Sequence, residues 1–279
     1  MIDIQSLSFT YKDEEHPALR DVTLTVPDGG FLGIIGPAGA GKTTLVRAVS
    51  GVIPHHYRGD FYGSVSVDGM DTVDTPLTDL SRAVGMVFQD VDSQIVSTEV
   101  EDEILYGLEN FGVPHSEIPE RLDFALERVG IADLRGRSIA SLSGGQRQKV
   151  AIASVIALRP KILVLDEPTG ELDPVSSRQV FSLLSSLRKD FGITVIVVEQ
   201  KIMLLCEFAD RLAVMDQGAV VRQGATRDVL AGADELEALG VNCPRVTTLS
   251  QLLSKRLGHS MPVCVNLDEA ETMARGLMA

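Results

Sequence analysis

One stretch decides the fold that this chain is expected to adopt: Gly36-Pro37-Ala38-Gly39-Ala40-Gly41-Lys42-Thr43-Thr44. The apolar residues 31–35 before it predict a buried strand, and residues 45–49 after it predict a helix. A glycine-rich loop that ends in Gly-Lys-Thr between a strand and a helix is the expected context of a phosphate-binding loop, the Walker A motif. The alternative is a glycine-rich turn that merely precedes a helix.

The residue types in this loop suit the phosphate groups of ATP. Glycines let backbone N–H groups approach phosphate oxygens closely, and the helix N-terminus adds a partial positive charge at the same place. We expect residues 36–44 to bind ATP, with Lys42 reaching the β- and γ-phosphates and the Thr43 hydroxyl ligating Mg²⁺.

A second motif lies at residues 162–167, where an apolar strand ends in Asp166 and Glu167. This is the Walker B pattern. Burying two adjacent carboxylates is costly unless a cation offsets their charge. We therefore expect Asp166 to lie in the Mg²⁺ shell and Glu167 to polarise the water that attacks the γ-phosphate.

Two further features are candidate nucleotide contacts. Ser143 is well placed as the N-cap of a helix that runs to Leu158, and Gly144 and Gly145 leave N–H groups unobstructed for an anion; the alternative is an ordinary capped helix. Tyr11, at the end of a predicted strand, is a candidate for stacking on a base, although such an aromatic residue is more often half buried.

Strands and helices alternate along the rest of the chain, which predicts an α/β fold. Strands are expected at 2–11, 22–26, 64–67, 83–88 and 193–198, with a hairpin at 211–222. A mainly helical insert is expected at about 90–158. In its helix 98–110, the acidic residues are expected to form a solvated face or, alternatively, a docking surface: Glu101, Asp102, Glu103 and Glu109.

Composition narrows the classes of function. The net charge of −14 over 279 residues argues against binding to nucleic acid, which needs a basic face. The start Met1-Ile2-Asp3-Ile4 lacks a basic region followed by an apolar segment, so no secretory signal is expected. Cys206, Cys243 and Cys264 have no metal-ligand spacing and are expected to be reduced thiols in a cytoplasmic protein, mostly buried.

Residues 2–232 resemble the ATP-binding cassette (ABC) ATPase family. Five motifs occur in the family's order: the phosphate loop at 36–43, the Q-loop residue Gln89, the signature Leu142-Ser143-Gly144-Gly145-Gln146, the Walker B strand 162–167 and the D-loop Glu171-Leu172-Asp173. The resemblance implies a phosphate-loop NTPase with a RecA-like core sheet, an N-terminal antiparallel β subdomain and an inserted helical subdomain within residues 1–240. It also implies a short C-terminal helical extension at 241–279.

The same resemblance implies a head-to-tail dimer that binds ATP and Mg²⁺. Each ATP would lie between the phosphate loop of one subunit and the signature of the other, where Ser143 and Gly145 would contact the γ-phosphate. Tyr11 would stack on the adenine. Gln89 would sense Mg²⁺ and the attacking water, and would relay the state of the site to a membrane partner.

A narrower resemblance is to the ATPases of energy-coupling factor transporters, carried by residues 100–110 and by the C-terminal tail. In the tail, Leu249, Leu252, Leu253 and Leu257 form one helical stripe, and Asn266 is a candidate cap with Glu269 as its partner. The stripe would join two ATPases or, alternatively, pack on its own domain. The resemblance implies a transmembrane coupling protein, a substrate-binding membrane protein, and uptake of a vitamin or transition-metal ion at the cytoplasmic face of the membrane.

One residue departs from the family pattern. Gln200 stands just after the strand 193–198, where the family usually has a histidine that contacts the γ-phosphate. An amide can donate a hydrogen bond but carries no proton charge. We expect slow hydrolysis, or a partner ATPase with a complete site, unless glutamine serves adequately.

Three other functions stay open at this stage. The chain could be the ATPase of a conventional ABC transporter with two membrane domains, or a regulatory subunit with little catalysis. An ABC protein that acts on ribosomes or DNA is disfavoured, because the chain has one cassette and an acidic balance. Neither the transported substrate nor the choice between homodimer and heterodimer follows from the sequence.

Overall fold

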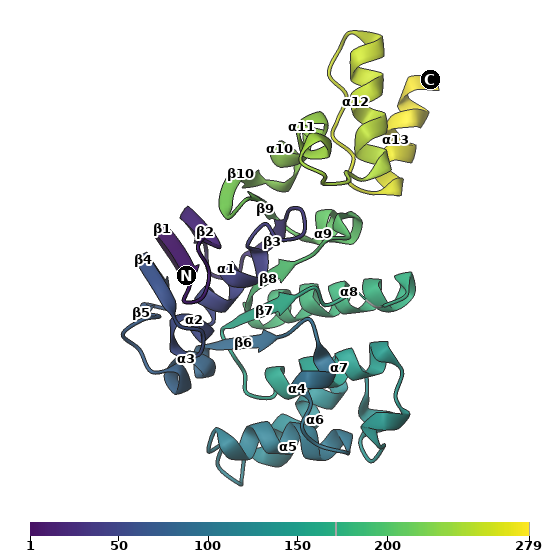
Figure 1. The fold of residues 1–279 in the computed structure, drawn as a ribbon. Coiled ribbons are helices and arrows are strands. Elements are labelled where there is room, and N and C mark those ends of the chain that lie inside the picture. The colour runs from purple at the N-terminus through teal and green to yellow at the C-terminus, as the bar shows by residue number, and fades with distance from the viewer. Residues whose placement is uncertain (171, 279) are drawn as a thin grey trace.

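The computed structural model describes residues 1–170 and 172–278. Within them the strands form two sheets (Figure 1). The larger sheet has the order β10-β9-β3-β8-β7-β6. Its strands are β3 (Phe31–Ile35), β6 (Val84–Val87), β7 (Ile162–Asp166), β8 (Thr194–Val198), β9 (Arg211–Asp216) and β10 (Ala219–Ala225). Strands β9, β3, β8, β7 and β6 are parallel, and β10 returns antiparallel to β9.

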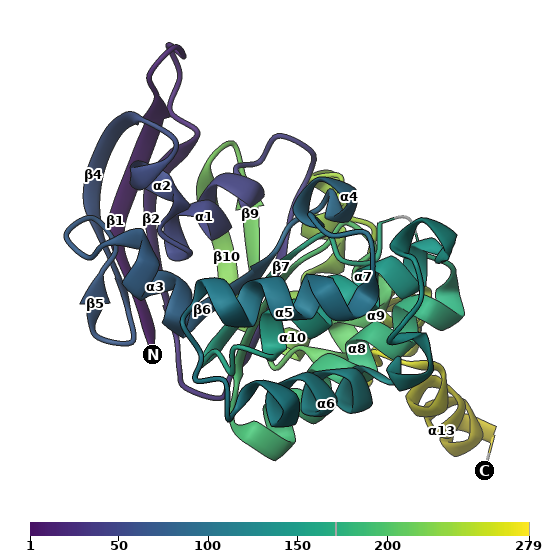
Figure 2. The same cartoon turned by 90° about the horizontal axis from the view of Figure 1, so that it is seen from below.

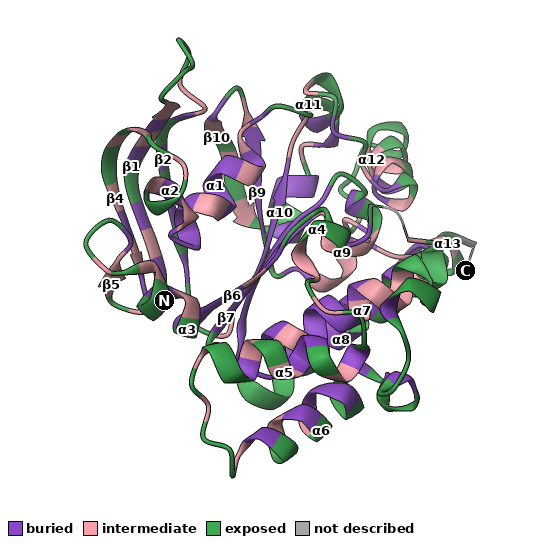
Figure 3. Cartoon of the chain, turned by 60° about the horizontal axis from the view of Figure 1, so that its bottom comes forward, coloured by how far each residue is buried: buried purple, intermediate pink, exposed green. Residues whose placement is uncertain are grey.

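The core strands are buried on both faces, as expected of a parallel sheet covered on both sides (Figure 3). Alternate residues face opposite layers. On β8, Val195 and Val197 pack with the helices on one face, whereas Ile196 and Val198 pack with the smaller sheet on the other. The predicted strands 31–35, 83–88, 162–167 and 193–198 are confirmed, with no boundary shifted by more than one residue.

The smaller sheet is antiparallel and has the order β2-β1-β4-β5. Its strands are β1 (Ile2–Tyr11), β2 (Leu19–Val26), β4 (Gly59–Val67) and β5 (Met70–Asp71). Beside it lie α1 (Lys42–Val49), α2 (Val52–His55) and α3 (Leu77–Ala83) (Figure 2). The apolar side of this sheet and α1 share one core with the larger sheet, so the phosphate-loop helix lies between the two sheets.

The predicted helical insert is confirmed. It contains α4 (Val91–Gln94), α5 (Val100–Asn110), α6 (Ile118–Val129), two 3₁₀ turns at Ala132–Leu134 and Ile139–Ser141, and α7 (Gly144–Ile156). The expected solvated acidic face on α5 is wrong for Glu103, which is buried. Its Oε2 accepts hydrogen bonds from the N–H groups of Val96 (3.0 Å) and Ser97 (2.8 Å) and so fixes the segment before α5.

The last part of the chain continues with α8 (Pro174–Phe191), α9 (Ile202–Phe208), α10 (Thr226–Leu230), α11 (Ala233–Ala238), α12 (Arg245–Leu257) and α13 (Leu267–Met278). Helices α12 and α13 lie side by side at the end of the molecule far from the smaller sheet (Figure 1). They share a small core of Cys264, Ala270 and Met273. Within the described residues, no helix combines the length and apolar composition that crossing a bilayer requires.

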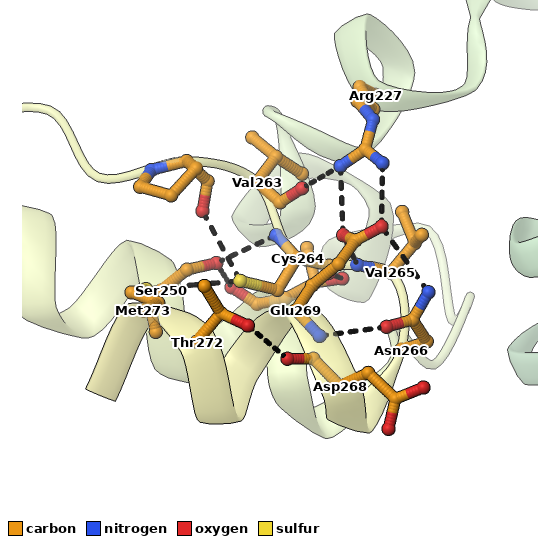
Figure 4. A network of polar contacts seen from close by, with 12 residues as sticks. Arg227, Ser250, Val263, Cys264, Val265, Asn266, Asp268, Glu269, Thr272 and Met273 are labelled. Carbon is orange, nitrogen blue, oxygen red and sulfur yellow. Dashed lines mark hydrogen bonds and ion pairs between the residues drawn. The ribbon is translucent and has the colours of Figure 1, made fainter. Parts of the chain in front are cut away.

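A polar network attaches this helical pair to the rest of the chain (Figure 4). Arg227, on α10, donates to both carboxylate oxygens of Glu269 and to the carbonyl oxygen of Val263. Asn266 and Glu269 exchange hydrogen bonds of 2.9 and 3.2 Å, which confirms the predicted cap. Of the leucine stripe, Leu253 packs on this small core, whereas Leu252 is 57% exposed.

Candidate functional site

The phosphate loop connects β3 directly to α1, as the sequence predicts. Gly36 and Gly41 have φ angles of 150° and 93°. A Cβ atom would lie 2.1 Å from the carbonyl oxygen of Met215 at Gly36, and 2.5 Å from that of Ala18 at Gly41. Both positions therefore require glycine, because the loop is pressed against β9 and against the start of β2.

Lys42 is 5% exposed and lies under the loop that precedes it. Its Nζ donates to the carbonyl oxygens of Gly36 (2.9 Å) and Pro37 (2.8 Å). Burial lowers the pKa of Lys42, while the carboxylates of Glu167 and Asp166 raise it. The structure thus brings the Walker A lysine beside both Walker B acids, although they are far apart in the sequence.

Asp166 ends β7 and is 2% exposed. Its Oδ1 has no hydrogen-bond partner among the described residues. Burial raises the pKa of Asp166, and a hydrogen bond from Thr43 and the charges of Arg47 and Lys42 lower it. A buried carboxylate oxygen without a donor, next to a threonine hydroxyl, fits the hard oxygen ligation that Mg²⁺ prefers.

Glu167 is held between two side-chain amides. Gln200 Nε2 donates to Glu167 Oε1 at 2.6 Å, and Gln89 Nε2 donates to Glu167 Oε2 at 3.1 Å. The backbone of Glu167 has a φ of 48°, and its N–H donates to the carbonyl oxygen of Val198. Such a conformation is unusual for a residue with a side chain and is typical of functional sites. The three side chains come from the ends of the neighbouring strands β6, β7 and β8.

The signature residues begin α7. Ser143 and Gln146 form a capping box: Ser143 Oγ accepts from the N–H of Gln146 at 3.3 Å, and Gln146 Oε1 accepts from the N–H of Ser143 at 2.9 Å. The predicted N-cap is therefore confirmed. Leu142 is buried and anchors the turn, while Gly144 lines a cavity of about 380 Å³ together with Gln89 and Glu167.

Asp173 caps the N-terminus of α8. Its carboxylate accepts from the N–H groups of Val175 and Ser176 and from the Ser176 hydroxyl, and these bonds lower the pKa of Asp173. Of the other two residues in the predicted D-loop, Leu172 lines the same cavity as Glu167, and Glu171 lies outside the described residues.

Tyr11 lies beside α1, with its hydroxyl 3.2 Å from Thr44 Oγ1. Its ring packs edge-on against Phe9 and Tyr57. The guanidinium of Arg47 lies 4.6 Å from the centre of the Tyr57 ring. The sequence did not predict that Tyr57 and Arg47 lie beside Tyr11. Tyr57 is a single aromatic residue in an irregular segment and Arg47 is a basic residue inside a helix, and neither belongs to a recognisable motif.

A buried contact between Glu199 and Thr169 belongs to no sequence motif. Glu199 Oε1 accepts from the Thr169 N–H at 3.0 Å and from the Thr169 hydroxyl at 2.6 Å. The acidic residue after an apolar strand was the one available signal, since a charged group in that place needs a partner when it is buried.

Comparison with known proteins agrees with this geometry. Residues 19–170 match the family model for ABC transporters. The chain belongs to the ABC transporter ATP-binding family. An ABC transporter ATP-binding protein of Pyrococcus abyssi is 43% identical over 256 residues, which span 92% of this chain and 91% of that protein. The energy-coupling factor transporter ATP-binding protein EcfA1 of Caldanaerobacter subterraneus is 40% identical over 91% of each chain.

Among solved structures, cbiO1 of Clostridium perfringens, part of the ABC transporter complex cbiONQ, superposes with a TM-score of 0.76. It is 32% identical, and the match covers 90% of this chain and 98% of that one. The predicted fold class, an ABC-type phosphate-loop ATPase, is confirmed. The chain is therefore the ATP-binding and ATP-hydrolysing subunit of a transporter.

Proposed function

We propose that Glu167 is the general base for ATP hydrolysis in this subunit. The observation that supports this role most directly is the pair of amide hydrogen bonds from Gln89 and Gln200 to its two carboxylate oxygens. These bonds orient Glu167 beside Lys42 and Asp166. A carboxylate held in this way can accept a proton from the water that attacks the γ-phosphate.

We propose that the phosphate loop binds the ATP phosphates through the backbone N–H groups of residues 36–44, with Lys42 near the β- and γ-phosphates. Because Lys42 now donates to carbonyl oxygens of its own loop, its ammonium must exchange those partners for phosphate oxygens when ATP binds. Tyr11 is proposed to stack on the adenine, and its half-buried position beside α1, the helix that follows the phosphate loop, supports that role.

Asp166, Thr43 and Gln89 are proposed to hold Mg²⁺. The unpartnered Oδ1 of Asp166 supports this assignment. When bound, Mg²⁺ would neutralise charge on the β- and γ-phosphates as a Lewis acid. Asp166 would keep its carboxylate ionised toward the ion, and the Thr43 hydroxyl would turn its oxygen to the same side.

The signature at 142–146 and the D-loop residue Asp173 are proposed to complete the site of a second ATPase in a head-to-tail dimer. Ser143 and the N–H groups of Gly144 and Gly145 lie at the N-terminus of the long helix α7, where the helix favours an anion. No hydrogen bond in the described part of the chain joins these residues to the phosphate loop, so another copy or a related ATPase can supply the γ-phosphate that they would contact.

We further propose that residues 1–240 form the ATPase domain and residues 241–279 an extension that contacts a second ATPase. The exposed leucines Leu249, Leu252 and Leu257 of α12 support this division. The similarity to EcfA1 and cbiO1 over about nine-tenths of the chain supports an energy-coupling factor type. Its partners would then be a transmembrane coupling protein and a substrate-binding membrane protein for a vitamin or transition-metal ion, at the cytoplasmic face of the membrane.

The variant Glu167→Gln tests the proposed base. It keeps the shape of the side chain but cannot accept a proton, so we expect kcat to fall about 100-fold or more while ATP still binds. Glu235→Gln is the matched control, because Glu235 is an exposed glutamate whose carboxylate pairs with Arg222. Wild-type turnover in Glu167→Gln would refute the assignment of the base.

The transporter type is tested by purifying the tagged chain from native membranes and identifying the proteins that accompany it. The proposal predicts one coupling protein and one small substrate-binding membrane protein. A pair of conventional permease subunits in their place would contradict the energy-coupling factor type and would leave the ATPase assignment unchanged.

A further inference from the structure

Glu199 is a buried carboxylate that the proposed reaction does not use. It follows β8 directly and is 1% exposed. Both donors of Thr169, its N–H at 3.0 Å and its hydroxyl at 2.6 Å, converge on the same oxygen, Oε1. Burial raises the pKa of Glu199, and the hydrogen bonds from Thr169 lower it. Burying a carboxylate costs free energy unless donors such as these form hydrogen bonds to it. Loss of the Thr169–Glu199 bonds would therefore disturb the backbone around both residues.

The contact closes a ring around the proposed base. Thr169 follows Glu167 in the turn after β7, and Gln200 follows Glu199 after β8. The turn and the strand end are joined at one point by the Thr169–Glu199 bonds and at another by the bond from Gln200 Nε2 to Glu167 Oε1 at 2.6 Å. Thr169 and Glu167 are two residues apart in the chain, and Glu199 and Gln200 are adjacent. The Thr169–Glu199 bonds therefore restrict the distance between the side chains of Gln200 and Glu167.

Other bonds tie this ring to the frame of the core sheet. The N–H of Glu199 donates to the carbonyl oxygen of Ile34 on β3, the strand that leads into the phosphate loop. Lys201 Nζ donates to the carbonyl oxygens of Gly170 (2.8 Å) and Thr169 (3.4 Å). The turn after Glu167 therefore has a fixed position relative to both Gln200 and the phosphate loop.

We propose that Glu199 is a positioning residue for ATP hydrolysis, which acts through Thr169 to hold the amide of Gln200 against the carboxylate of Glu167. Glu199 itself is 1% exposed, and its Oε1 accepts the hydrogen bonds from Thr169. This inference rests on the proposed role of Glu167 as the base. A displacement of about 1 Å at a catalytic group can lower turnover by about 100-fold, so a contact that sets this distance is expected to affect kcat.

The test compares Thr169→Val with Thr169→Ser in the purified full-length chain. Valine has nearly the shape of threonine but lacks the hydroxyl, whereas serine keeps it. We expect Thr169→Val to lower kcat about 10-fold, with the KM for ATP and the Kd for a fluorescent ATP analogue within about twofold of wild type. Thr169→Ser is expected to retain at least half of the wild-type kcat. An unchanged kcat in Thr169→Val overturns the proposal.

A double-mutant cycle separates positioning from general loss of structure. If Thr169 acts through Gln200, Thr169→Val lowers kcat by less than about twofold once Gln200→Ala is present. If the two substitutions lower kcat by independent factors, Glu199 does not position Gln200. Equal losses in kcat and nucleotide affinity would likewise overturn the proposal, since they indicate a disturbed fold.

Two further variants, Glu199→Gln and Glu167→Gln, complete the test of the positioning role. If Thr169→Val does not fold, Glu199→Gln replaces it, because the amide keeps one acceptor oxygen but exchanges the other for an N–H donor. A wild-type kcat in Glu199→Gln overturns the proposal. Glu167→Gln distinguishes the two hypotheses. Loss of turnover in Glu167→Gln with no effect of Thr169 or Glu199 variants contradicts only the positioning role, whereas full turnover in Glu167→Gln contradicts the proposed base itself.

Discussion

Gln200 donates its side-chain amide to the carboxylate of Glu167 at 2.6 Å. The bond lies at the position where the resemblance to the family places a histidine, so here an amide orients the carboxylate that we propose as the general base. An amide cannot change its charge between pH 5 and 8, whereas an imidazole can. The orientation of Glu167 is thus provided here without a titratable group.

This relationship predicts the effect of Gln200→His. We expect kcat to rise about threefold or more, because an imidazole can also contact the γ-phosphate, and we expect a new limb near pH 6.5 in the pH profile. Gln200→Ala is the control and is expected to lower kcat, since it removes the bond to Glu167. Steady-state ATPase assays of the purified protein between pH 5.5 and 8.5 (a range of about three units around the imidazole pKa) measure both effects. Equal kcat in wild type and Gln200→His would contradict the prediction.

Ser143 caps α7, and its proposed second role, binding a phosphate, can be separated from the first by substitution. Ser143→Asp keeps a good N-cap but places a negative charge where the γ-phosphate of a second subunit is expected. The free energy of unfolding is expected to stay within about 0.5 kcal/mol of wild type, while Ser143→Ala loses about 1 kcal/mol with the cap.

For the same variants, ATP turnover is expected to reverse this order. Ser143→Asp should be almost inactive, because carboxylate and phosphate repel each other, and Ser143→Ala should keep part of its activity. Chemical unfolding and ATPase assays on the same samples give both quantities. Hydrolysis at the wild-type rate by Ser143→Asp would show that the signature turn does not contact a phosphate.

The sequence predicted most of the fold because the core strands are short apolar runs that end at functional residues. Lys42 and Asp166 could be placed together for this reason: Lys42 lies in the loop and helix start after β3, Asp166 ends β7, and the carboxyl ends of parallel strands meet at one edge of the sheet. The contacts that the sequence did not predict depend on tertiary structure. Glu103 was expected in solvent but is buried, because the chain before α5 turns back onto it. Neither periodicity nor a motif records such a contact.

The ion pair between Arg227 and Glu269 predicts how pH affects the attachment of the C-terminal helices (Figure 4). The hydrogen bond from Arg227 holds the pKa of Glu269 below its ordinary value, with smaller contributions from the N–H of Val265 and the side chain of Asn266. A lowered pKa in the folded state means that the ionised form stabilises the fold. This contribution is complete above the ordinary glutamate pKa of about 4.3 and is lost as the pH falls through the folded value.

The measurement is the difference in thermal midpoint between wild type and Glu269→Gln. We expect wild type to be more stable at pH 7, and we expect the difference to shrink as the pH falls below about 4.3. Glu271→Gln is the control on the same helix, because Glu271 forms an exposed pair with Arg275 and is expected to have little effect. A difference that grows toward acid pH would contradict the role of the ion pair.

The exposed leucines of α12 predict the oligomeric state. Leu249, Leu252 and Leu257 are 44%, 57% and 45% exposed, so these three leucines of the stripe are left partly uncovered by the rest of the chain. If it contacts a second ATPase, Leu252→Glu lowers the dimer fraction in sedimentation velocity experiments at fixed protein concentration. Val73→Glu introduces the same charge at an exposed apolar residue outside α12 and is expected to leave the dimer unchanged. An equal dimer fraction in both variants would show that Leu252 of α12 does not lie in the dimer contact.

In the proposed dimer, each ATP is bound by the phosphate loop of one copy and the signature turn of another. Mixing Lys42→Ala with Ser143→Asp is a direct test of this arrangement. Each variant alone is expected to be nearly inactive, since both of its sites are defective. In the mixed dimer, one site combines an intact loop with an intact signature.

The mixture is measured for ATP turnover after subunit exchange, which a pull-down of differently tagged copies verifies. We expect activity to reappear on mixing, to about a quarter of the wild-type rate when half of the dimers are mixed and each has one intact site of two. A mixture that forms mixed dimers but hydrolyses no more ATP than the two variants alone would contradict it.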